Sequence, residues 1–503
     1  MPSPTRRQLL LGLAAAPIAL SLSCSGESGP RAGSAEGSGR PLPIPPLAPS
    51  TVDSSGIRRF TLRAAPGSTE IVDGRRTATW GYNGSILGPT LRARRGETVA
   101  VEFENGLPAP TTLHWHGMHL PARCDGGPHQ TVQPGDRWEP SWTVRQPAAT
   151  LWYHPHPHGE TEKHVYRGLA GLFIIDDDAS PTDLPHDYGV DDIPLIIQDR
   201  RFTSTGDLDE SDPTDAGLLG DTIMTNGIAG AHLPAQSERL RLRLLNGSGG
   251  RLYNLGFADD RKFHLIGTDG GLLSSPVAMT RVQLSPGERV EIVVDVRSGK
   301  PVLLRSFPID KGAGLGRPEA ARFGMNDAFD VLEIRPSRTL RPSASLPAVL
   351  ADLPAPDVAH VTTDRSFVMK WFMINHQRMD MNRIDFSPTV DAGELWTVRN
   401  VDNWPHNFHV HDTQFRIVDI DGSPPPPELA GYKDTVYTPP GQRIRLSVRF
   451  SDYTDPTYPY MYHCHLAMHE DQGMMGQFLV LGPDQKPAPM AMDMSGGAVH
   501  SMR

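Results

Sequence analysis

Four His-x-His units constrain the fold of this 503-residue chain more than any other feature of its sequence. In an extended strand, residues i and i+2 point to the same face, so each unit would present two imidazoles together. We therefore expect strands at all four places and a shared site built from the eight histidines. The units are His114/His116, His154/His156, His409/His411 and His463/His465.

The sequence around these units also repeats. A turn followed by a strand, residues 95–105, precedes the first unit, and residues 392–400 precede the third unit in the same way. A middle copy of the strand, residues 238–246, is followed at 253–255 by Tyr-Asn-Leu, where a His-x-His unit would be expected. Repeated short alternating runs broken by Gly and Pro predict an all-β chain of three small β-sandwich domains in tandem. Their expected ranges are residues 53–180, 185–337 and 360–483.

The fourth unit encloses a cysteine, Cys464, which on a strand would point away from His463 and His465. His469 and Met474 follow closely, so a thiolate, an imidazole and a thioether are available on the cysteine side. A second imidazole would complete a site with two histidines, one cysteine and a weak axial methionine, which is the ligand set of blue copper proteins. The soft thiolate favours copper over zinc. We therefore predict a copper protein in which one short strand serves two metal sites.

Both ends of the chain are predicted to lie outside the sandwiches. Residues 1–24 have the pattern of a twin-arginine export signal, because two arginines precede an apolar run that is too short to cross a membrane. Cys24 is either the acceptor of a lipid anchor or part of a signal that is simply cleaved off. Residues 25–52, rich in Ser, Gly and Pro, are predicted to be a flexible linker, and residues 484–503 a methionine-containing tail.

Charge and cysteine content narrow the classes of partner. The formal net charge of −10 argues against nucleic acid, because no basic stripe is available to replace the counterions of phosphates. Three cysteines cannot form a disulfide framework, and we expect Cys124 to be a small buried residue. We expect an exported monomer without a transmembrane span, located in the periplasm, at the cell surface or outside the cell.

The histidine motifs together resemble those of the three-domain multicopper oxidases, the family of laccases, bilirubin oxidases, spore-coat laccases and periplasmic cuprous oxidases. The resemblance extends from about Ile57 to Pro483 and implies three cupredoxin-like Greek-key domains that hold four copper ions. The motifs that carry it are His114-Trp115-His116-Gly117, His154-Pro155-His156, His406-Asn407-Phe408-His409-Val410-His411, and His463-Cys464-His465 with His469 and Met474.

The resemblance also implies which residues bind each copper ion. The type 1 ligands would be His406, Cys464, His469 and Met474. The type 2 ligands would be His114 and His409. The type 3 pair would be held by His116, His154, His156, His411, His463 and His465.

The implied reaction is the one-electron oxidation of four donor molecules coupled to the reduction of O₂ to two waters. Asp125 and Glu470 match acidic residues that similar enzymes use near the oxygen-reducing site, so we predict that they supply protons. The alternative is that each only accepts a hydrogen bond from a ligating imidazole or lies at the surface.

The identity of the donor stays open at this stage. Phenolic or other aromatic compounds, bilirubin-like pigments and metal ions such as Cu(I) are all candidates. Residues 340–360 contain no methionine, unlike the Met-rich segment that cuprous oxidases of this family carry, and Trp404 suggests a site for aromatic donors. A second hypothesis is a copper-free structural or cell-division protein on the same fold, but such proteins lack the cysteine site that Cys464 represents here.

Overall fold

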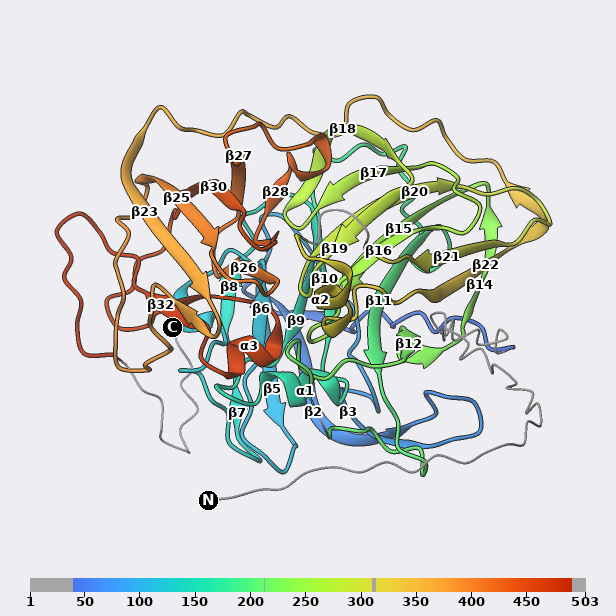
Figure 1. Cartoon of the computed structure of the whole chain (residues 1–503), viewed down its shortest axis with the longest axis horizontal. Coiled ribbons are helices and arrows are strands. Elements are labelled where there is room, and N and C mark those ends of the chain that lie inside the picture. Colours follow the sequence, from blue (N-terminus) through green and yellow to red (C-terminus); the bar gives the residue numbers. More distant parts are fainter. Residues whose placement is uncertain (1–38, 212, 310–313, 491–503) are drawn as a thin grey trace, which may run out of the picture. The chain divides into compact units, whose positions relative to one another are not determined.

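β-Strands dominate the computed structural model, which describes residues 39–211, 213–309 and 314–490. The strands form six sheets, and each sheet draws its strands from one of three consecutive stretches of the sequence (Figure 1). The helical segments are α1 (Thr161–Tyr166), α2 (Arg317–Arg322) and α3 (Ala467–Asp471), with 3₁₀ turns η1 (Ala122–Cys124) and η2 (Pro427–Leu429). Among the described helices, none has the length and apolarity needed to cross a membrane. The predicted all-β class is confirmed. The predicted export signal, including Cys24, lies outside the described residues.

The first two sheets use residues 51–176 and pack face to face. Phe60 from one sheet contacts Phe173 from the other, with ring centroids 6.4 Å apart, inside one apolar core. The larger sheet contains β1 (Thr51–Val52), β2 (Arg58–Thr69), β3 (Thr77–Tyr82), β5 (Thr98–Asn105), β7 (Arg137–Trp138) and β8 (Ser141–Thr143). The smaller sheet runs in the order β4 (Leu91–Arg94), β10 (Gly171–Asp176), β9 (Ala149–His154) and β6 (His114–His116).

The second sandwich uses residues 192–341, and β22 continues to Arg341, past the predicted boundary at residue 337. Leu242 and Leu255, from different sheets, share its core. The larger sheet has the order β13 (Ile228–Ala229), β12 (Thr222–Thr225), β11 (Asp192–Arg200), β15 (Arg239–Asn246), β20 (Arg289–Asp295), β17 (Phe263–Thr268) and β18 (Gly271–Met279). The smaller sheet has the order β14 (His232–Ser237), β22 (Phe329–Arg341), β21 (Val302–Ser306), β16 (Tyr253–Phe257) and β19 (Arg281–Leu284).

The third sandwich uses residues 361–478. Phe367 of one sheet packs on Phe408 of the other with ring centroids 5.2 Å apart. The larger sheet has the order β24 (Met373–Ile374), β23 (Val361–Lys370), β25 (Gly393–Asn400), β30 (Arg443–Arg449), β27 (Phe415–Ile420) and β28 (Tyr432–Lys433). The smaller sheet has the order β29 (Thr435–Thr438), β26 (His406–Val410), β31 (Tyr460–His463) and β32 (Met475–Phe478).

The three strands that repeat in the sequence occupy equivalent places in the three sandwiches. β5, β15 and β25 each pair in parallel with the first long strand of their own sandwich, which is β2, β11 or β23. The histidine strands repeat as well, because His114 lies opposite His154 in the first sandwich and His409 lies opposite His463 in the third. The first and third sandwiches therefore present their histidines in the same register.

The C-terminal end of the predicted linker differs from the expectation of a free tether. Leu42 is 6% exposed and belongs to the core of the second sandwich. The backbone N–H of Leu42 donates to the carbonyl oxygen of His232 at 2.7 Å, and that of Ala48 donates to the carbonyl oxygen of Thr90 at 2.8 Å. Apolar side chains among the prolines of this segment can bury surface against the second sandwich, so residues 41–52 pack on the domains.

One buried guanidinium, that of Arg289, connects all three sandwiches. Arg289 extends from β20 of the second sandwich and donates to both carboxylate oxygens of Asp434, in the third sandwich, at 2.7 Å. It also donates to the carbonyl oxygen of Thr150, in β9 of the first sandwich, at 3.0 Å. Gly117 follows β6 here with φ +84°, and a Cβ atom at that position would lie 2.5 Å from Asp434 Oδ2. The close approach therefore requires glycine.

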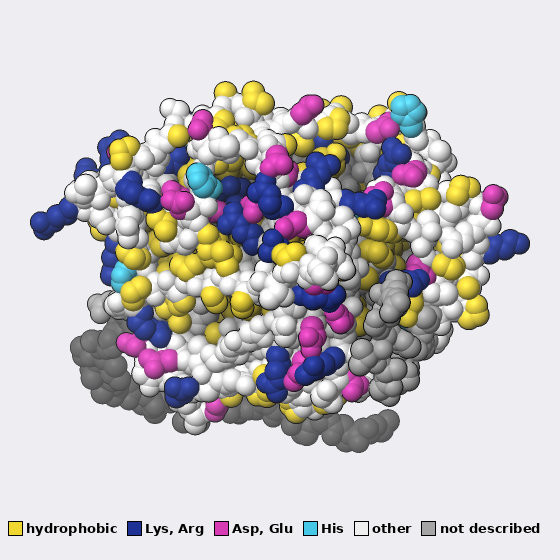
Figure 2. Space-filling model, turned by 180° about the vertical axis from the view of Figure 1, so that it is seen from behind, with side chains coloured by type: hydrophobic (Ala, Val, Ile, Leu, Met, Phe, Trp, Pro, Cys, Tyr) yellow, Lys and Arg dark blue, Asp and Glu magenta, His cyan; other side chains and the backbone are white. Residues whose placement is uncertain are grey.

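We predict that Arg289→Met destabilises the protein by about 3–5 kcal/mol, because it leaves the buried carboxylate of Asp434 without its cation. A urea titration followed by circular dichroism measures the effect. The matched control is Arg137→Met, because Arg137 pairs with Glu102 and Glu104 at the surface. This substitution should lower the free energy of unfolding by less than about 1 kcal/mol. Figure 2 shows that acidic and basic side chains are interspersed over one face of the molecule, as expected for surface ion pairs of this kind. Equal losses for the two variants would contradict the role given to Arg289.

A second connection, through His119, joins the first and third sandwiches. The His119 ring lies between two carboxylates, with Nδ1 2.9 Å from Asp412 Oδ1 and Nε2 3.0 Å from Asp452 Oδ2. Burial alone would lower the pKa of His119, but Asp412 and Asp452 outweigh it and raise the pKa to about 9. Tyr453 packs against the ring, and Arg145 pairs with Asp452. His119 is therefore protonated at neutral pH and donates to both carboxylates.

We predict that this stabilisation depends on pH in one direction. The pKa of His119 is higher in the folded protein than in the unfolded chain. The contribution of His119 to the free energy of unfolding is therefore complete below about pH 6.5 and is lost as the pH rises through about 9. His119→Gln should cost about 1–2 kcal/mol at pH 6, after allowance for solvent screening, and much less at pH 10. Urea titrations at both values measure the difference. His360→Gln, at an exposed histidine, is the control, and a cost for His119→Gln that does not change with pH would contradict the prediction.

Candidate metal centre

The histidines of the four His-x-His units meet where the first and third sandwiches join. Together with His406, His469 and Cys464 they form four buried groups in which the possible ligand atoms all lie within 4.8 Å of one another. Each of these groups contains residues from more than one segment of the chain. The groups are His114/His116/His409, His116/His154/His465, His156/His411/His463 and His406/Cys464/His469.

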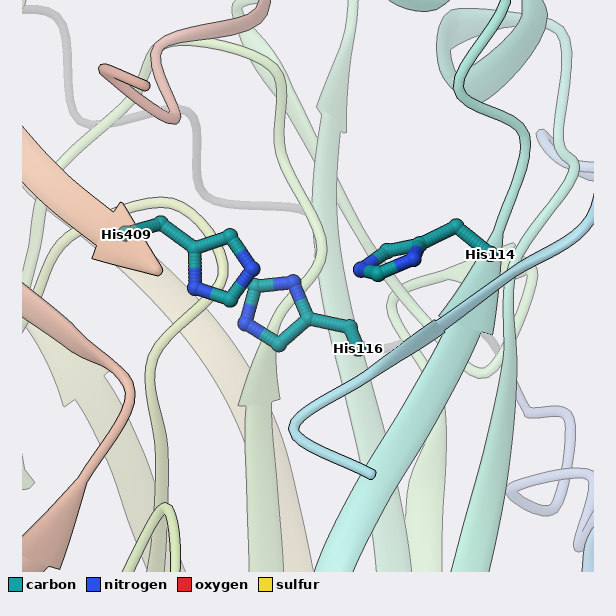
Figure 3. A group of neighbouring side chains, drawn as sticks. All are labelled: His114, His116 and His409. Carbon is teal, nitrogen blue, oxygen red and sulfur yellow. The ribbon is translucent and has the colours of Figure 1, made fainter. Parts of the chain in front are cut away.

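The first group combines β6 of the first sandwich with β26 of the third. Figure 3 shows the rings of His114, His116 and His409 directed toward one another from these two strands. The rings of His116 and His409 stack with centroids 3.8 Å apart and an interplanar angle of 10°. Three nitrogens, His114 Nε2, His116 Nδ1 and His409 Nε2, are buried without a hydrogen-bond partner among the described residues. Buried lone pairs that converge in this way fit a metal ion.

The nitrogens of His156, His411 and His463 also converge on one place that a metal ion could occupy. The Nε2 atom of His463 lies 3.1 Å from Nε2 of His156 and 3.2 Å from Nε2 of His411. Nδ1 of His411 donates to Asp125 Oδ2 at 2.7 Å, and Nδ1 of His463 donates to the carbonyl oxygen of Cys464 at 3.1 Å. In both histidines the ring proton therefore lies on Nδ1, on the side of the ring that faces away from the other imidazoles. Their inner nitrogens carry lone pairs that a cation between the rings would satisfy.

The group of His406, Cys464 and His469 is a compact set with two imidazoles and one thiol. Nδ1 of His406 lies 3.1 Å from Nδ1 of His469, and Cys464 Sγ lies 3.7 Å and 3.6 Å from these two atoms. Nε2 of His469 donates to the carbonyl oxygen of Asp215 at 2.8 Å, so its inner nitrogen is the one that is free to bind. This donor set, with one soft sulfur and two imidazoles, fits copper.

Burial keeps the imidazoles whose pKa is lowered in the neutral state that a metal requires. Burial, followed by repulsion from neighbouring imidazoles, lowers the pKa of His465 and of His469 to about 3. The same causes hold the pKa values of six further histidines well below their usual range, so their rings are neutral: His116, His154, His156, His409, His411 and His463. Burial raises the pKa of the Cys464 thiol to about 12. A cation bound at the group would compensate the charge of the thiolate, which is how thiol ligands become deprotonated.

The tripeptide His463-Cys464-His465 supplies three different groups. The sequence suggested one face for both histidines, but β31 ends at His463, so the strand alternation does not extend through Cys464 and His465. The backbone N–H of His465 instead donates to Asn407 Oδ1 at 2.6 Å, and that of Cys464 donates to the carbonyl oxygen of Met474 at 3.0 Å. Three adjacent residues thereby reach three sites.

The carboxylates of Asp125 and Glu470 both lie beside the histidine groups. Asp125 follows η1 and accepts from His411, while its backbone carbonyl oxygen accepts from His114 Nδ1 at 2.8 Å. Glu470, in α3, has Oε1 3.3 Å from His156 Nδ1 and Oε2 3.3 Å from His463 Nδ1. Burial, reinforced by Asp471, raises the pKa of Glu470 well above its usual range. Neither residue is at the surface, so that part of the alternative does not apply.

Helix α1 of the first sandwich and helix α3 of the third lie side by side and hold Glu470 in place (Figure 1). Thr161 Oγ1 donates to Glu470 Oε1 at 2.7 Å. The carboxylate of Asp471 accepts from the backbone N–H groups of Thr161 and Glu162 at 2.8 Å and 2.9 Å. Asp471 therefore satisfies donors that α1 cannot use internally.

Several residues that orient the imidazoles were not found by sequence reasoning. Nε2 of His116 donates to Asp434 Oδ1 at 3.0 Å, and Nδ1 of His409 donates to the carbonyl oxygen of Asp434 at 2.9 Å. Nε2 of His406 lies 3.4 Å from Asp402 Oδ2. Asp402 is only four residues before His406, so its position was the one available signal. Asp434 is distant in sequence from every histidine unit and could not have been identified.

Met474, the remaining predicted ligand, and Cys124, predicted to be a small buried residue, are both buried. Met474 is fully buried, and its backbone bonds to both Cys464 and His469. Cys124 is buried as expected, and its Sγ lies 3.5 Å from the carbonyl oxygen of Ser141.

Comparisons with known proteins agree with this geometry. A family model described as multicopper oxidase matches residues 64–180, and a second with the same description matches residues 351–484. A multicopper oxidase, mco, of Staphylococcus haemolyticus is 36% identical over 441 residues, which is 87% of this chain and 92% of that protein. The cell division protein FtsP of Salmonella typhimurium is also 36% identical, over 95% of this chain and 98% of that protein.

Solved structures show the same similarity. The crystal structure of a laccase from Pediococcus acidilactici has a TM-score of 0.80 and 35% sequence identity, and the match covers 88% of this chain and 94% of the laccase. The family models match the two sandwiches that carry the buried histidines. The matches to the relatives cover nearly the whole length of those proteins. The chain therefore belongs to the multicopper oxidase family, whose members are copper oxidoreductases that use O₂.

Proposed function

We propose that the chain couples four one-electron oxidations of a donor to the reduction of O₂ to two waters, with four copper ions. The type 1 ion would be held by His406, Cys464, His469 and Met474. The type 2 ion would be held by His114 and His409. The type 3 pair would be held by His116, His154, His156, His411, His463 and His465. The observation that carries the proposal is the buried Cys464 thiol, packed against two imidazoles and joined by peptide bonds to two other histidine groups.

We call His406, Cys464 and His469 the thiolate group and the three groups made only of histidines the histidine groups. Copper would supply a one-electron acceptor at the thiolate group and the capacity to reduce O₂ at the histidine groups. The protein's own part is to hold the imidazoles rigid and to connect the groups. Cys464 is covalently continuous with His463 and His465, so a short bonded path joins the thiolate to both halves of the proposed type 3 site. Asn407 reinforces this path, because its Oδ1 accepts from the His465 backbone and lies 3.6 Å from Cys464 Sγ.

Asp125 and Glu470 are proposed to deliver the protons that water formation requires. Each has one buried carboxylate oxygen without a hydrogen-bond partner among the described residues, Asp125 Oδ1 and Glu470 Oε2. The raised pKa of Glu470 favours the protonated form, which can donate. Asp125 is placed between the two histidine units of opposite sandwiches, where it can pass a proton inward.

The donor is proposed to be a phenolic or other aromatic compound, with Cu(I) and other metal ions as the alternative. The similarity to a laccase supports the first class. Export by the twin-arginine route, a location outside the cytoplasm and a monomeric state complete the proposal, and a lipid anchor at Cys24 would keep the protein at a membrane surface.

A second candidate function is a structural role in cell division, favoured by the similarity to FtsP over nearly the whole chain. That role needs no metal. The complete group of Cys464, His406 and His469, buried and free of competing partners on its inner side, argues for the oxidase. Copper analysis of the purified protein separates the two, since the structural role predicts no stoichiometric copper and no O₂ consumption.

We predict that Cys464→Ser removes the blue colour and abolishes O₂ consumption, because serine is a hard ligand that does not replace the thiolate. Copper content should fall from four ions to three, since the histidine groups are intact. Absorption spectra, metal analysis and oxygen-electrode assays with a phenol, bilirubin and Cu(I) provide the measurements. Cys124→Ser is the matched control and should keep both colour and turnover. A colourless, inactive wild-type protein with full copper would refute the proposed oxidase.

We predict that Asp125→Asn slows O₂ reduction by about 10²-fold or more while the blue absorption is unchanged, because the amide cannot donate a transferable proton. The measurement is the rate at which the fully reduced protein reoxidises with O₂. Asp136→Asn, at an acidic residue away from the histidine groups, should leave the rate as it is. Unchanged reoxidation in the Asp125 variant would show that Asp125 only orients His411.

A further inference from the structure

The two imidazoles of the thiolate group differ in whether a chain of hydrogen bonds connects them to the protein surface. The outer nitrogen of His469 is already used, because Nε2 donates to the carbonyl oxygen of Asp215. The ring itself is covered by Phe372 and Trp404, whose centroids lie 5.4 Å and 5.9 Å away. His469 is fully buried, so a donor molecule has no direct approach to it.

His406 has a short hydrogen-bonded connection to the surface. Its Nε2 faces Asp402 Oδ2, and the same carboxylate oxygen accepts from the backbone N–H of Trp371. Trp371 is 52% exposed, whereas Asp402 is 7% exposed and His406 is fully buried. The sequence of contacts from Trp371 through Asp402 to His406 therefore leads from solvent to the thiolate group in two steps.

The backbone at Trp371 is unfavourable for a large side chain. Lys370 pairs with Met373, so Trp371 and Phe372 form the two-residue turn between β23 and β24. Trp371 has φ +54°, and Phe372 is not among the described residues with positive φ. A two-residue turn with positive φ only at its first central position strongly prefers glycine there. A tryptophan held in such a conformation and exposed to solvent indicates a function other than folding.

Trp371 and Val401 are exposed apolar residues on neighbouring segments of the third sandwich. Among the described residues, Trp371 is the one aromatic side chain in the set of exposed large hydrophobic residues. Val401, 40% exposed, lies on the adjacent segment, where its backbone N–H donates to the carbonyl oxygen of Met369 at 3.1 Å. Lys370 Nζ lies 5.1 Å from the centroid of the indole. The Lys370 ammonium lies over the indole ring, and an exposed indole next to a cation suits an aromatic ring that carries a hydroxyl group.

We propose that Trp371 and Val401 form the docking platform for a planar phenolic donor and that Asp402 and His406 connect this platform to the thiolate group. The inference rests on the proposed oxidase function and names the substrate class of that site. Each phenol that stacks on Trp371 loses one electron toward the thiolate group and releases its hydroxyl proton to solvent, which leaves a phenoxyl radical. Four phenols supply four electrons, and these with four protons convert one O₂ into two waters.

The same contacts disfavour a metal ion as the donor at this platform. Asp402 Oδ2 is shared between Trp371 and His406, and Asp402 Oδ1 accepts from the backbone N–H of Asn403 at 2.7 Å. Both carboxylate oxygens are therefore engaged. The exposed surface offers an indole and an aliphatic side chain, which are poor ligands for Cu(I).

The test uses the copper-loaded protein with Trp371→Gly, Trp371→Phe and the control Val349→Ala, at an exposed valine elsewhere. Glycine is the residue that the turn prefers, so the first variant removes the indole without straining the fold. Binding of 4-nitrophenol, a phenol that is hard to oxidise, is measured by saturation-transfer NMR. We expect its Kd to rise about fivefold or more in Trp371→Gly and to stay within about twofold in Trp371→Phe and Val349→Ala. Equal Kd values for wild type and Trp371→Gly would overturn the proposal.

A second measurement separates this proposal from the oxidase function itself. The rate at which the blue absorption is lost under anaerobic conditions is recorded with 2,6-dimethoxyphenol and with Cu(I). Trp371→Gly should slow the reaction with the phenol about fivefold or more and leave that with Cu(I) unchanged. Equal slowing with both donors would mean that the variant disturbs the metal group, which also counts against the platform. A wild-type protein that reacts with neither donor would refute the oxidase function, while the binding measurement would still decide the role of Trp371.

Discussion

Imidazole nitrogens that face one another with no proton between them are the constraint on which the rest of the structure depends. In the group of His156, His411 and His463, ring nitrogens lie 3.1–3.2 Å apart. Such an arrangement suits a metal ion under two conditions: the ring protons are held on the outer side, and the ion satisfies the lone pairs inside. The carboxylate of Asp125 and backbone carbonyl oxygens meet the first condition. Copper meets the second, in agreement with membership of the multicopper oxidase family.

The second sandwich has no histidine unit, yet the site depends on it. Its Arg289 binds Asp434, and Asp434 in turn orients His116 from the first sandwich and His409 from the third. The guanidinium also reaches the backbone of Thr150 in the first sandwich. A middle domain without ligands thus supplies the buried cation that balances a carboxylate next to the metal groups.

The thiolate group is asymmetric in a way that bears on the choice of donor. His469 is closed off by Asp215 and by aromatic rings, while His406 communicates with the surface through Asp402 and Trp371. The sites proposed for oxygen reduction and for donor binding are thereby separate, because the histidine groups lie between the first and third sandwiches and the exposed indole lies on the turn between β23 and β24. The peptide bonds of His463-Cys464-His465 join the two regions.

Much of this could be predicted from the sequence because the information is local. The i, i+2 spacing of the histidines, the repeated turn and strand, and the cysteine between His463 and His465 require only knowledge of strand geometry. They led to the all-β class and to the residues that gather in the buried groups, while the family came from the resemblance of the motifs to those of known proteins. Only the tertiary structure decided how those residues divide. It assigned His463 and His465 to different groups, brought Asp434 and Arg289 to His116 and His409, packed residues 41–52 on the domains, and joined the backbone of Trp371 to Asp402. The reason is that these contacts join residues that are far apart in the chain, or depend on where a strand ends, and periodicity within a single strand carries no information about either.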